Sequence, residues 1–238
     1  MALDELNPEV ATTAAARTQA DARVAGFLRS VYGWMCGGLA ITAAVALWVS
    51  TTPGLVQTIA TNRLLFWGII IAQFGIVIYL SARVQRLAPA TAALLFVGYS
   101  ALTGVFLSFV LLLYTAQSVA STFLVTAGMF GSLALYGTVT KRDLTGVGQF
   151  AMMGLFGVLI AMVVGIFWQN SMLQFVISVC GVVVFTCLTA WDAQRLRAMA
   201  LSLPDGRTGS YAIVGALKLY LDFINLFLFL LNLFGRRR

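Results

Sequence analysis

The chain has 238 residues, of which 61% are hydrophobic and 10% are charged, and its formal net charge is +7. Soluble domains average about 45–50% apolar and about 25% charged residues, so this composition excludes an ordinary soluble domain and indicates a polytopic membrane protein. Histidine is absent, which excludes a Ser-His-Asp triad, a Cys-His pair, an HExxH zinc site and haem ligation by histidine.

Apolar runs long enough to cross a membrane recur along the chain after a polar, alanine-rich start. A span needs about 20 apolar residues, and irregular backbone is too costly in lipid, so each span is expected to be a helix. We predict an all-α bundle of seven transmembrane helices over residues 28–238, preceded by a cytoplasmic, partly disordered tail over 1–27. The predicted spans are 28–50, 64–82, 91–114, 119–139, 148–168, 172–192 and 211–234.

The basic residues predict how these spans are oriented. With the N-terminus in the cytoplasm, the only basic residue in the outer loops is Arg63. The C-terminal Arg236-Arg237-Arg238 is an exception, because seven spans place these three basic residues outside. The positive-inside rule therefore favours seven spans with an inner N-terminus. Because the basic residues lie in short connections and form no basic helix, we expect contact with the lipid bilayer and none with nucleic acid. The inner side then holds Arg17, Arg23, Arg29, Arg83, Arg86, Lys141, Arg142, Arg195, Arg197 and Arg207.

Small residues recur at spacings that allow helices to approach closely. Gly33 and Gly37 form a GxxxG pair, and Gly128 and Gly131 are near neighbours. Such pairs arise by chance among 22 glycines, and we attribute them to general close packing of helices.

Two carboxylates, Asp192 and Asp222, lie inside or at the edge of the last two spans, whereas the other acids lie in tails or loops. An ionised acid at the centre of a bilayer costs about 3 kcal/mol or more, which makes such a residue a functional candidate. Taken alone, Asp192 could pair with Arg195 three residues later. Two acids on consecutive helices predict one shared site.

The last span carries an unusual set of polar residues. Their offsets of 7, 4, 3 and 7 residues put them on one narrow stripe of a helix whose other residues are mostly Leu, Ile and Phe. We expect this helix to lie within the bundle, with its stripe turned to partners or water. A simpler alternative is a structural pair between Lys218 and Asp222, four residues apart. The stripe consists of Tyr211, Lys218, Asp222, Asn225 and Asn232.

Three segments resemble one family. The segment 219–227, Leu-Tyr-Leu-Asp-Phe-Ile-Asn-Leu-Phe, resembles the hallmark of the Bax inhibitor-1 family, also called the transmembrane Bax inhibitor motif family, and Gly235 fits its end. Asp192 in a Trp-Asp pair is similar, although many members have Tyr before this Asp, and 99–104 (Tyr-Ser-Ala-Leu-Thr-Gly) is similar as well. The resemblance covers nearly all of the chain after residue 28, and the sequences of the tail and turns are most similar to the bacterial YccA-type branch.

The resemblance implies a bundle with six helices around a central seventh, in a bacterial inner membrane. It implies that Asp192 and Asp222 form a pH-sensitive latch on calcium leak, and that an arginine at the inner end of the second span engages Asp192. Arg83 is the first match for that arginine and Arg86 the alternative. Bacterial relatives of this type are also linked to modulation of a membrane-bound quality-control protease.

Physical chemistry is consistent with a latch. Two close carboxylates in a low dielectric cannot easily both ionise, so they share a proton and titrate as a pair. Ca²⁺ prefers about 6–8 oxygen ligands, and Asp192, Asp222 and Asn225 offer too few for tight binding. We therefore expect weak transit of Ca²⁺ near these residues, protons as the second ion, and no resident metal or cofactor.

Three other functions remain open. An intramembrane aspartyl protease also has two aspartates on consecutive helices, but its second Asp normally follows Gly-x-Gly, whereas Lys218-Leu219-Tyr220-Leu221 precedes Asp222 here. No enzymatic activity is therefore expected. A proton-coupled transporter could use Lys218 and Asp222 as a relay. A non-transporting regulator could bind a membrane protease instead.

Overall fold

The computed structural model describes residues 8–52, 54–168, 170–203 and 208–238. Within these ranges there is no β-strand, and a single isolated antiparallel bridge joins Tyr114 and Arg237. The chain forms eight helices in the described ranges: α1 (Pro8–Thr51), α2 (Leu55–Thr61), α3 (Arg63–Arg83), α4 (Pro89–Leu113), α5 (Ala116–Val139), α6 (Thr145–Phe167), α7 (Ser171–Ser202) and α8 (Thr208–Phe234).

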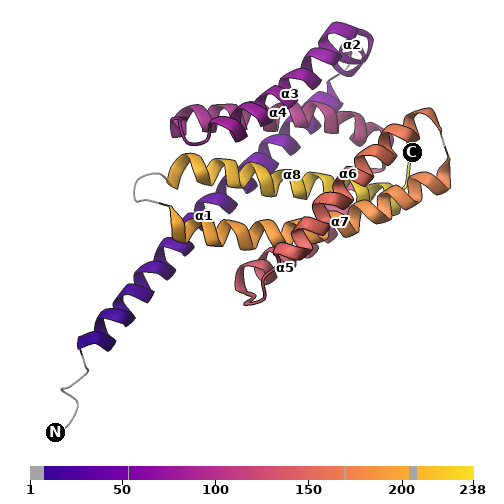
Figure 1. The fold of residues 1–238 in the computed structure, drawn as a ribbon. Coiled ribbons are helices and arrows are strands. Elements are labelled where there is room, and N and C mark those ends of the chain that lie inside the picture. Colours follow the sequence, from indigo (N-terminus) through magenta and orange to yellow (C-terminus); the bar gives the residue numbers. More distant parts are fainter. Residues whose placement is uncertain (1–7, 53, 169, 204–207) are drawn as a thin grey trace.

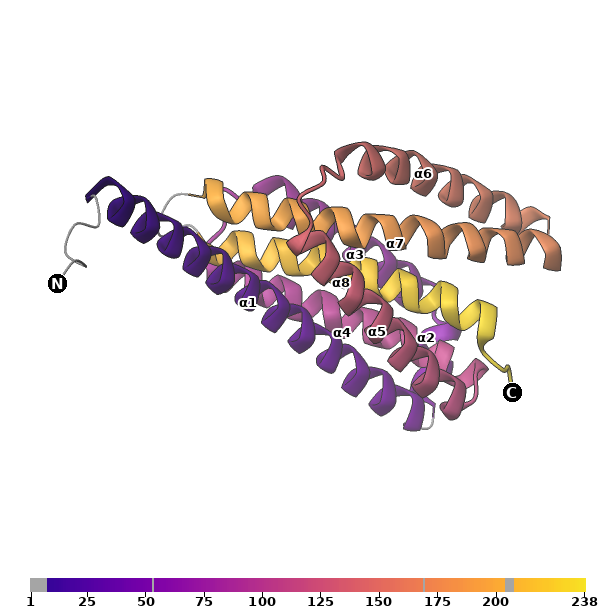
Figure 2. The ribbon, with the colours of Figure 1, turned by 90° about the horizontal axis from the view of Figure 1, so that it is seen from below.

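Seven of these helices are long and apolar enough to cross a membrane, which confirms the predicted class and number of spans. The additional helix is α2, which has 7 residues and links α1 to α3. Helix α1 begins at Pro8, so it has no boundary at the predicted junction of tail and bundle at residue 27. Figures 1 and 2 show its N-terminal part projecting beyond the other helices. Residues 1–7 of the predicted tail lie outside the described residues.

Helix α8 is the centre of the bundle. Of its most apolar 18-residue stretch, 67% is buried inside the protein, against 39% for the corresponding stretch of α7 and 6% for that of α3. It packs against α1, α4, α5 and α7, and Figures 1 and 2 show it between these helices. Helices α3 and α6 lie at the periphery, where α3 packs mainly on α4 and α6 on α7. The expected central seventh span is therefore confirmed.

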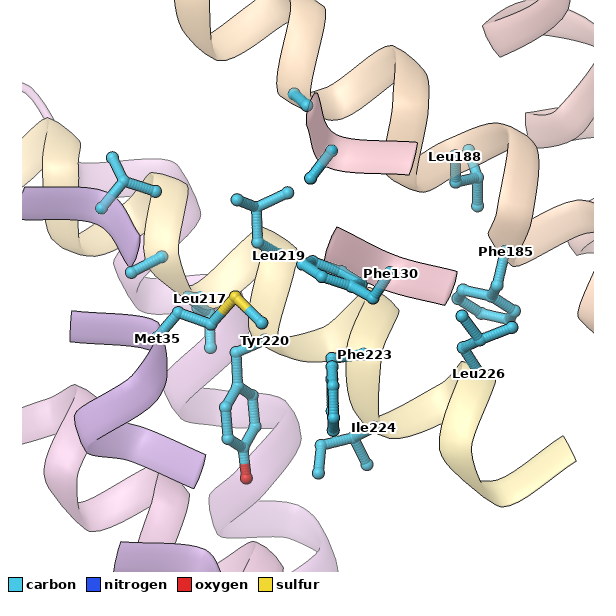
Figure 3. Packing of buried hydrophobic residues seen from close by; sticks show 14 of the residues in the cluster. Met35, Phe130, Phe185, Leu188, Leu217, Leu219, Tyr220, Phe223, Ile224 and Leu226 are labelled. Atoms are coloured by element: carbon cyan, nitrogen blue, oxygen red, sulfur yellow. The ribbon is translucent and has the colours of Figure 1, made fainter. Parts of the chain in front are cut away.

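The core consists of apolar side chains that radiate from α8 toward its neighbours. In Figure 3, Leu219, Phe223 and Leu226 of α8 lie near Phe130 of α5 and Phe185 of α7. The rings of Phe130 and Phe223 meet edge to face, with centroids 5.5 Å apart. Because apolar residues surround α8 on most sides, its few polar side chains are enclosed by neighbouring helices instead of facing lipid.

Two glycines on neighbouring helices let α7 approach closely, one at its backbone and one at a side-chain ring. A β-carbon at Gly137 of α5 would overlap the carbonyl group of Ala190, and one at Gly148 of α6 would overlap the ring of Trp191. The expectation for Gly33, Gly37, Gly128 and Gly131 was wrong, because a β-carbon at any of them meets nothing within 4 Å. Spacing along one helix does not say which face meets another helix.

Replacing Gly137 with Ala should lower the free energy of unfolding by about 1–3 kcal/mol, because the new methyl group overlaps the Ala190 backbone. The matched control is Gly131→Ala on the same helix, where there is open space. This control should be neutral or stabilising by up to about 1 kcal/mol, since Ala favours helix more than Gly does. Unfolding of the purified protein in mixed detergent micelles measures both, and equal effects would contradict the close α5–α7 contact.

Candidate functional site

An ion pair joins the central helix to α7. The ammonium nitrogen of Lys218 lies 2.7 Å from Oδ1 of Asp192. The Asp192 side chain is 7% exposed and that of Lys218 is 44% exposed. The Lys218 ammonium also lies 5.6 Å from the ring centroid of Trp191, within range of a cation–π interaction. Lys218 therefore holds a buried carboxylate while much of its own side chain remains accessible.

Asp222 lies one turn beyond Lys218 on the same face of α8 and is 6% exposed. Its Oδ2 atom is buried and has no hydrogen-bond partner among the residues that the structure describes. Asp222 is near enough to Asp192 and Lys218 to interact electrostatically with both. The structure thus brings together the two acids that were expected to share a site, and it adds Lys218, which binds Asp192.

These charged groups line one cavity of about 460 Å³ between the two peripheral helices. Its walls are mostly apolar, and two of the wall residues, Phe74 and Leu159, are exposed at the molecular surface. The polar groups come mainly from α8 and α7, so they are concentrated on one side of the cavity. The lining residues are Gln73, Phe74 and Val77 of α3, Tyr99 of α4, Met152, Leu155 and Leu159 of α6, Phe185, Leu188 and Asp192 of α7, and Lys218, Leu221, Asp222 and Asn225 of α8.

The predicted polar stripe of α8 divides into three environments. Lys218, Asp222 and Asn225 line the cavity just described. Asn232 donates a hydrogen bond from Nδ2 to Oγ of Ser178 on α7, over 2.8 Å. Tyr211 lines a separate hollow at the loop between α3 and α4. The stripe therefore serves as the site at its middle and contacts other parts of the bundle at its ends.

Neither predicted latch arginine is the ion partner of Asp192 within the described part of the chain. The guanidinium carbon of Arg83 lies 5.8 Å from the ring centroid of Tyr79 on its own helix. Arg86 lines the hollow at the α3–α4 loop. In this structure Lys218 holds the position assigned to an arginine, and the Arg83 or Arg86 latch stays a prediction.

The two simpler pairings that the sequence left open are also replaced by other contacts. Lys218 pairs with Asp192 on the neighbouring helix instead of with Asp222 on its own helix. The guanidinium carbon of Arg195 lies 5.5 Å from the ring centroid of Trp191. A contact between helices therefore replaces the expected pair on α8, whereas Arg195 contacts another residue of its own helix, Trp191 instead of Asp192.

A hydroxyl cluster on another side of α8 was missed by the sequence analysis. The hydroxyl groups of Thr42 on α1 and Tyr220 on α8 lie 2.6 Å apart. Thr42 also donates to the carbonyl oxygen of Ser100 over 2.8 Å. A fully buried tyrosine needs a partner for its hydroxyl group, so Tyr220 in an apolar run was the available signal. The partner itself depends on how α1 packs.

A second missed feature ties the α5–α6 loop to α7 just beyond Asp192. Gln194 accepts a hydrogen bond from Leu144 N over 2.9 Å and donates one to Arg142 O over 2.7 Å. In the same loop, Asp143 accepts hydrogen bonds from Thr145 N and Oγ1, which lower the pKa of its carboxyl group. These bonds fix the loop beside the helix that carries Asp192.

Comparisons with known proteins agree on one family. The family model described as "Inhibitor of apoptosis-promoting Bax1" matches residues 24–238. The inner membrane protein YbhL of Escherichia coli K12 is 46% identical over 215 residues, covering 89% of this chain and 92% of YbhL. An uncharacterized protein of Deinococcus radiodurans is 44% identical over 216 residues, covering 90% and 92%. Protein RP147 of Rickettsia prowazekii is 38% identical over 230 residues, covering 95% and 96%.

The unequal burial of the ion pair predicts unequal costs of breaking it. Lys218→Met leaves Asp192 buried without its partner, and it should cost about 2–3 kcal/mol of unfolding free energy. Asp192→Asn leaves a half-exposed lysine that can turn its charge toward water, and it should cost about 1 kcal/mol. Equilibrium unfolding in detergent micelles compares the two variants. A larger cost for Asp192→Asn would contradict the view that the buried carboxylate needs the lysine more than the lysine needs the carboxylate.

Proposed function

Because this chain belongs to the Bax inhibitor-1 family of multi-pass membrane proteins, we propose that it is a pH-sensitive cation leak pathway, or the regulator of one, controlled by Asp192 and Asp222. The observation that carries the proposal is that both carboxyl groups line one cavity and interact with each other. By its likeness to an inner membrane protein of E. coli, we assign the chain to a bacterial inner membrane.

Protonation is the natural control at such a site. Asp192 is neutralised by Lys218, whereas Oδ2 of Asp222 has no partner within the described residues. A proton gained or lost by either acid changes the field at the other, since the charges are close and poorly screened. The charge that faces the cavity therefore depends on pH, and with it the attraction of the cavity for a cation.

The ligands in the cavity favour passage of Ca²⁺ over storage. Its carboxyl and amide oxygens come from Asp192, Asp222, Asn225 and Gln73, and together they only reach the lower limit of the 6–8 oxygens of a tight calcium site. One of these oxygens, Oδ1 of Asp192, is already bound by Lys218. Among the described residues, no group of three or more acidic or cysteine side chains is arranged to hold a metal. A weakly held ion can leave, which a leak requires.

The ends of the helices support an inner N-terminus with seven crossings. Thr115 N donates to Arg236 O over 3.1 Å, and Arg238 N donates to Leu113 O over 2.9 Å. The C-terminal arginines thus lie at the α4–α5 turn, at the ends of α4 and α5 opposite to the basic α3–α4 and α5–α6 loops. These three arginines, the exception to the positive-inside rule, are held there by backbone hydrogen bonds, and on this topology they lie outside the cytoplasm.

Single Asn substitutions at Asp192 or Asp222 should flatten the pH dependence of calcium flux into proteoliposomes. Each variant should behave as though locked near one protonation state, because Asn cannot ionise. The double variant should add little, since residues that act as one unit are not additive. Asp143→Asn, in the exposed α5–α6 loop, is the matched control and should respond as the wild type does.

Two results would contradict this proposal. If both single variants keep the wild-type pH response, or if their effects simply add, the aspartates are independent structural residues. If the wild type gives no flux at any pH, the leak reading is wrong, and the alternative of a non-transporting regulator of a membrane protease is favoured.

The latch arginine can be identified in the same assay. An arginine that reaches Asp192 in another state of the protein would compete with Lys218 for this carboxylate. We expect Arg83→Ala to shift the pH at which flux changes by up to about one unit, the usual range for loss of a nearby opposite charge. A shift in Arg86→Ala alone would move the role to Arg86. No shift in either variant would leave Lys218 as the only cation that engages Asp192.

A further inference from the structure

We propose that Lys218 is a tethered cation that competes with divalent ions for the cavity that Asp192 and Asp222 line, and thereby sets the charge selectivity of that cavity. The inference deepens the proposed function, on which it rests, by assigning a residue of this chain to the choice between divalent and monovalent ions.

The position of the ammonium group is the first step. Lys218 Nζ lies 2.7 Å from Asp192 Oδ1, close to the 2.3–2.6 Å at which a calcium ion lies from its oxygen ligands. The ammonium therefore stands where a cation bound to Asp192 would stand. A metal ion and the Lys218 ammonium cannot both occupy this position.

The second step is that Lys218 has somewhere else to go. Its side chain is 44% exposed and lines the cavity of about 460 Å³. The ring of Trp191, 5.6 Å from Nζ, offers the ammonium a second contact of a kind that does not need the carboxylate. Lys218 can thus release Asp192 by moving within the cavity, without any change in helix packing.

The third step is a count of charge. The α3, α4 and α6 residues of the wall carry no charged side chain, and their one titratable group is the phenol of Tyr99. The charged groups that line the cavity are Asp192, Asp222 and Lys218, which sum to −1 when all are ionised. One monovalent ion neutralises that charge, whereas one divalent ion overshoots it. Without Lys218 the charge is −2, which matches a divalent ion.

A set of variants varies this charge while the walls of the cavity stay unchanged. Asp192→Asn gives 0, the wild type gives −1, the double variant Asp192→Asn with Lys218→Met also gives −1, and Lys218→Met gives −2. Lys218→Arg keeps the charge of the wild type. Lys141→Met removes an exposed lysine from the α5–α6 loop and is the matched control.

The experiment measures the ratio of Ca²⁺ to K⁺ flux into proteoliposomes at the alkaline end of the pH range, where the carboxyl groups are ionised. Lys218→Met should raise the ratio about tenfold or more over the wild type, because the competing charge lies within a few ångströms of the ion. The double variant should return toward the wild-type ratio although the ion pair is gone. Lys218→Arg and Lys141→Met should stay near the wild type.

A purely structural ion pair predicts a different pattern. It predicts that the double variant behaves like Lys218→Met or worse, and that the flux ratio does not follow net charge; either result would overturn the inference. If Lys218→Met fails to fold, the step from Asp192→Asn to the double variant tests the same change of one charge, and an unchanged ratio across it would also overturn the inference.

Calcium binding separates this inference from the proposed leak. In titrations of the purified protein in lipid nanodiscs, the Ca²⁺ concentration for half saturation should fall about tenfold or more in Lys218→Met. Absent flux with this shift in binding would contradict the leak and support the competing role of Lys218. Unchanged binding, with or without flux, would overturn the inference about Lys218.

Discussion

Taking the charge of Asp192 out of water is costly, and its close pairing with Lys218 is what offsets the cost. Their contact of 2.7 Å forms at one register of α8 against α7. It also explains how the most enclosed helix of the bundle can carry a charge. An enclosed helix has a neighbour on the side of the charge, and here that neighbour, α7, supplies the carboxylate that pairs with it. Asp222 then lies beside an existing ion pair, and its charge state is felt by both members.

Hydrogen bonds near both ends of α8 hold this register. At one end, Ser210 donates to the carbonyl oxygen of Leu87 in the α3–α4 loop over 2.7 Å. Toward the other end, Asn232 donates to Ser178 of α7, and the backbone of the C-terminal arginines bonds to the α4–α5 turn. Helices α3 and α6 lie at the periphery on either side of the cavity. The charged groups thus have a firm support on α7 and α8, and the two peripheral helices supply the other walls of the cavity.

The sequence predicted what depends on local rules. Length and apolarity identified seven spans, and helical periodicity gathered Lys218, Asp222 and Asn225, which line one cavity. It did not predict that Lys218 binds Asp192, because a pairing between helices depends on their packing, and the pairing four residues away on one helix is the more obvious choice. The close contacts of Gly137 and Gly148 were missed for the same reason. Helix α2 was missed because 7 residues are too few for a clear periodic signal.

The central claim is that Asp192 and Asp222 form one electrostatically coupled site within the membrane, and infrared difference spectroscopy tests it most directly. The carboxyl bands of the two residues, assigned by isotope labelling, are followed across pH in the wild type and in each single Asn variant. Coupling predicts that the pH at which the Asp222 band titrates moves when Asp192 is replaced, and that the reverse also holds. A band that titrates at the same pH with and without its neighbour would contradict the account.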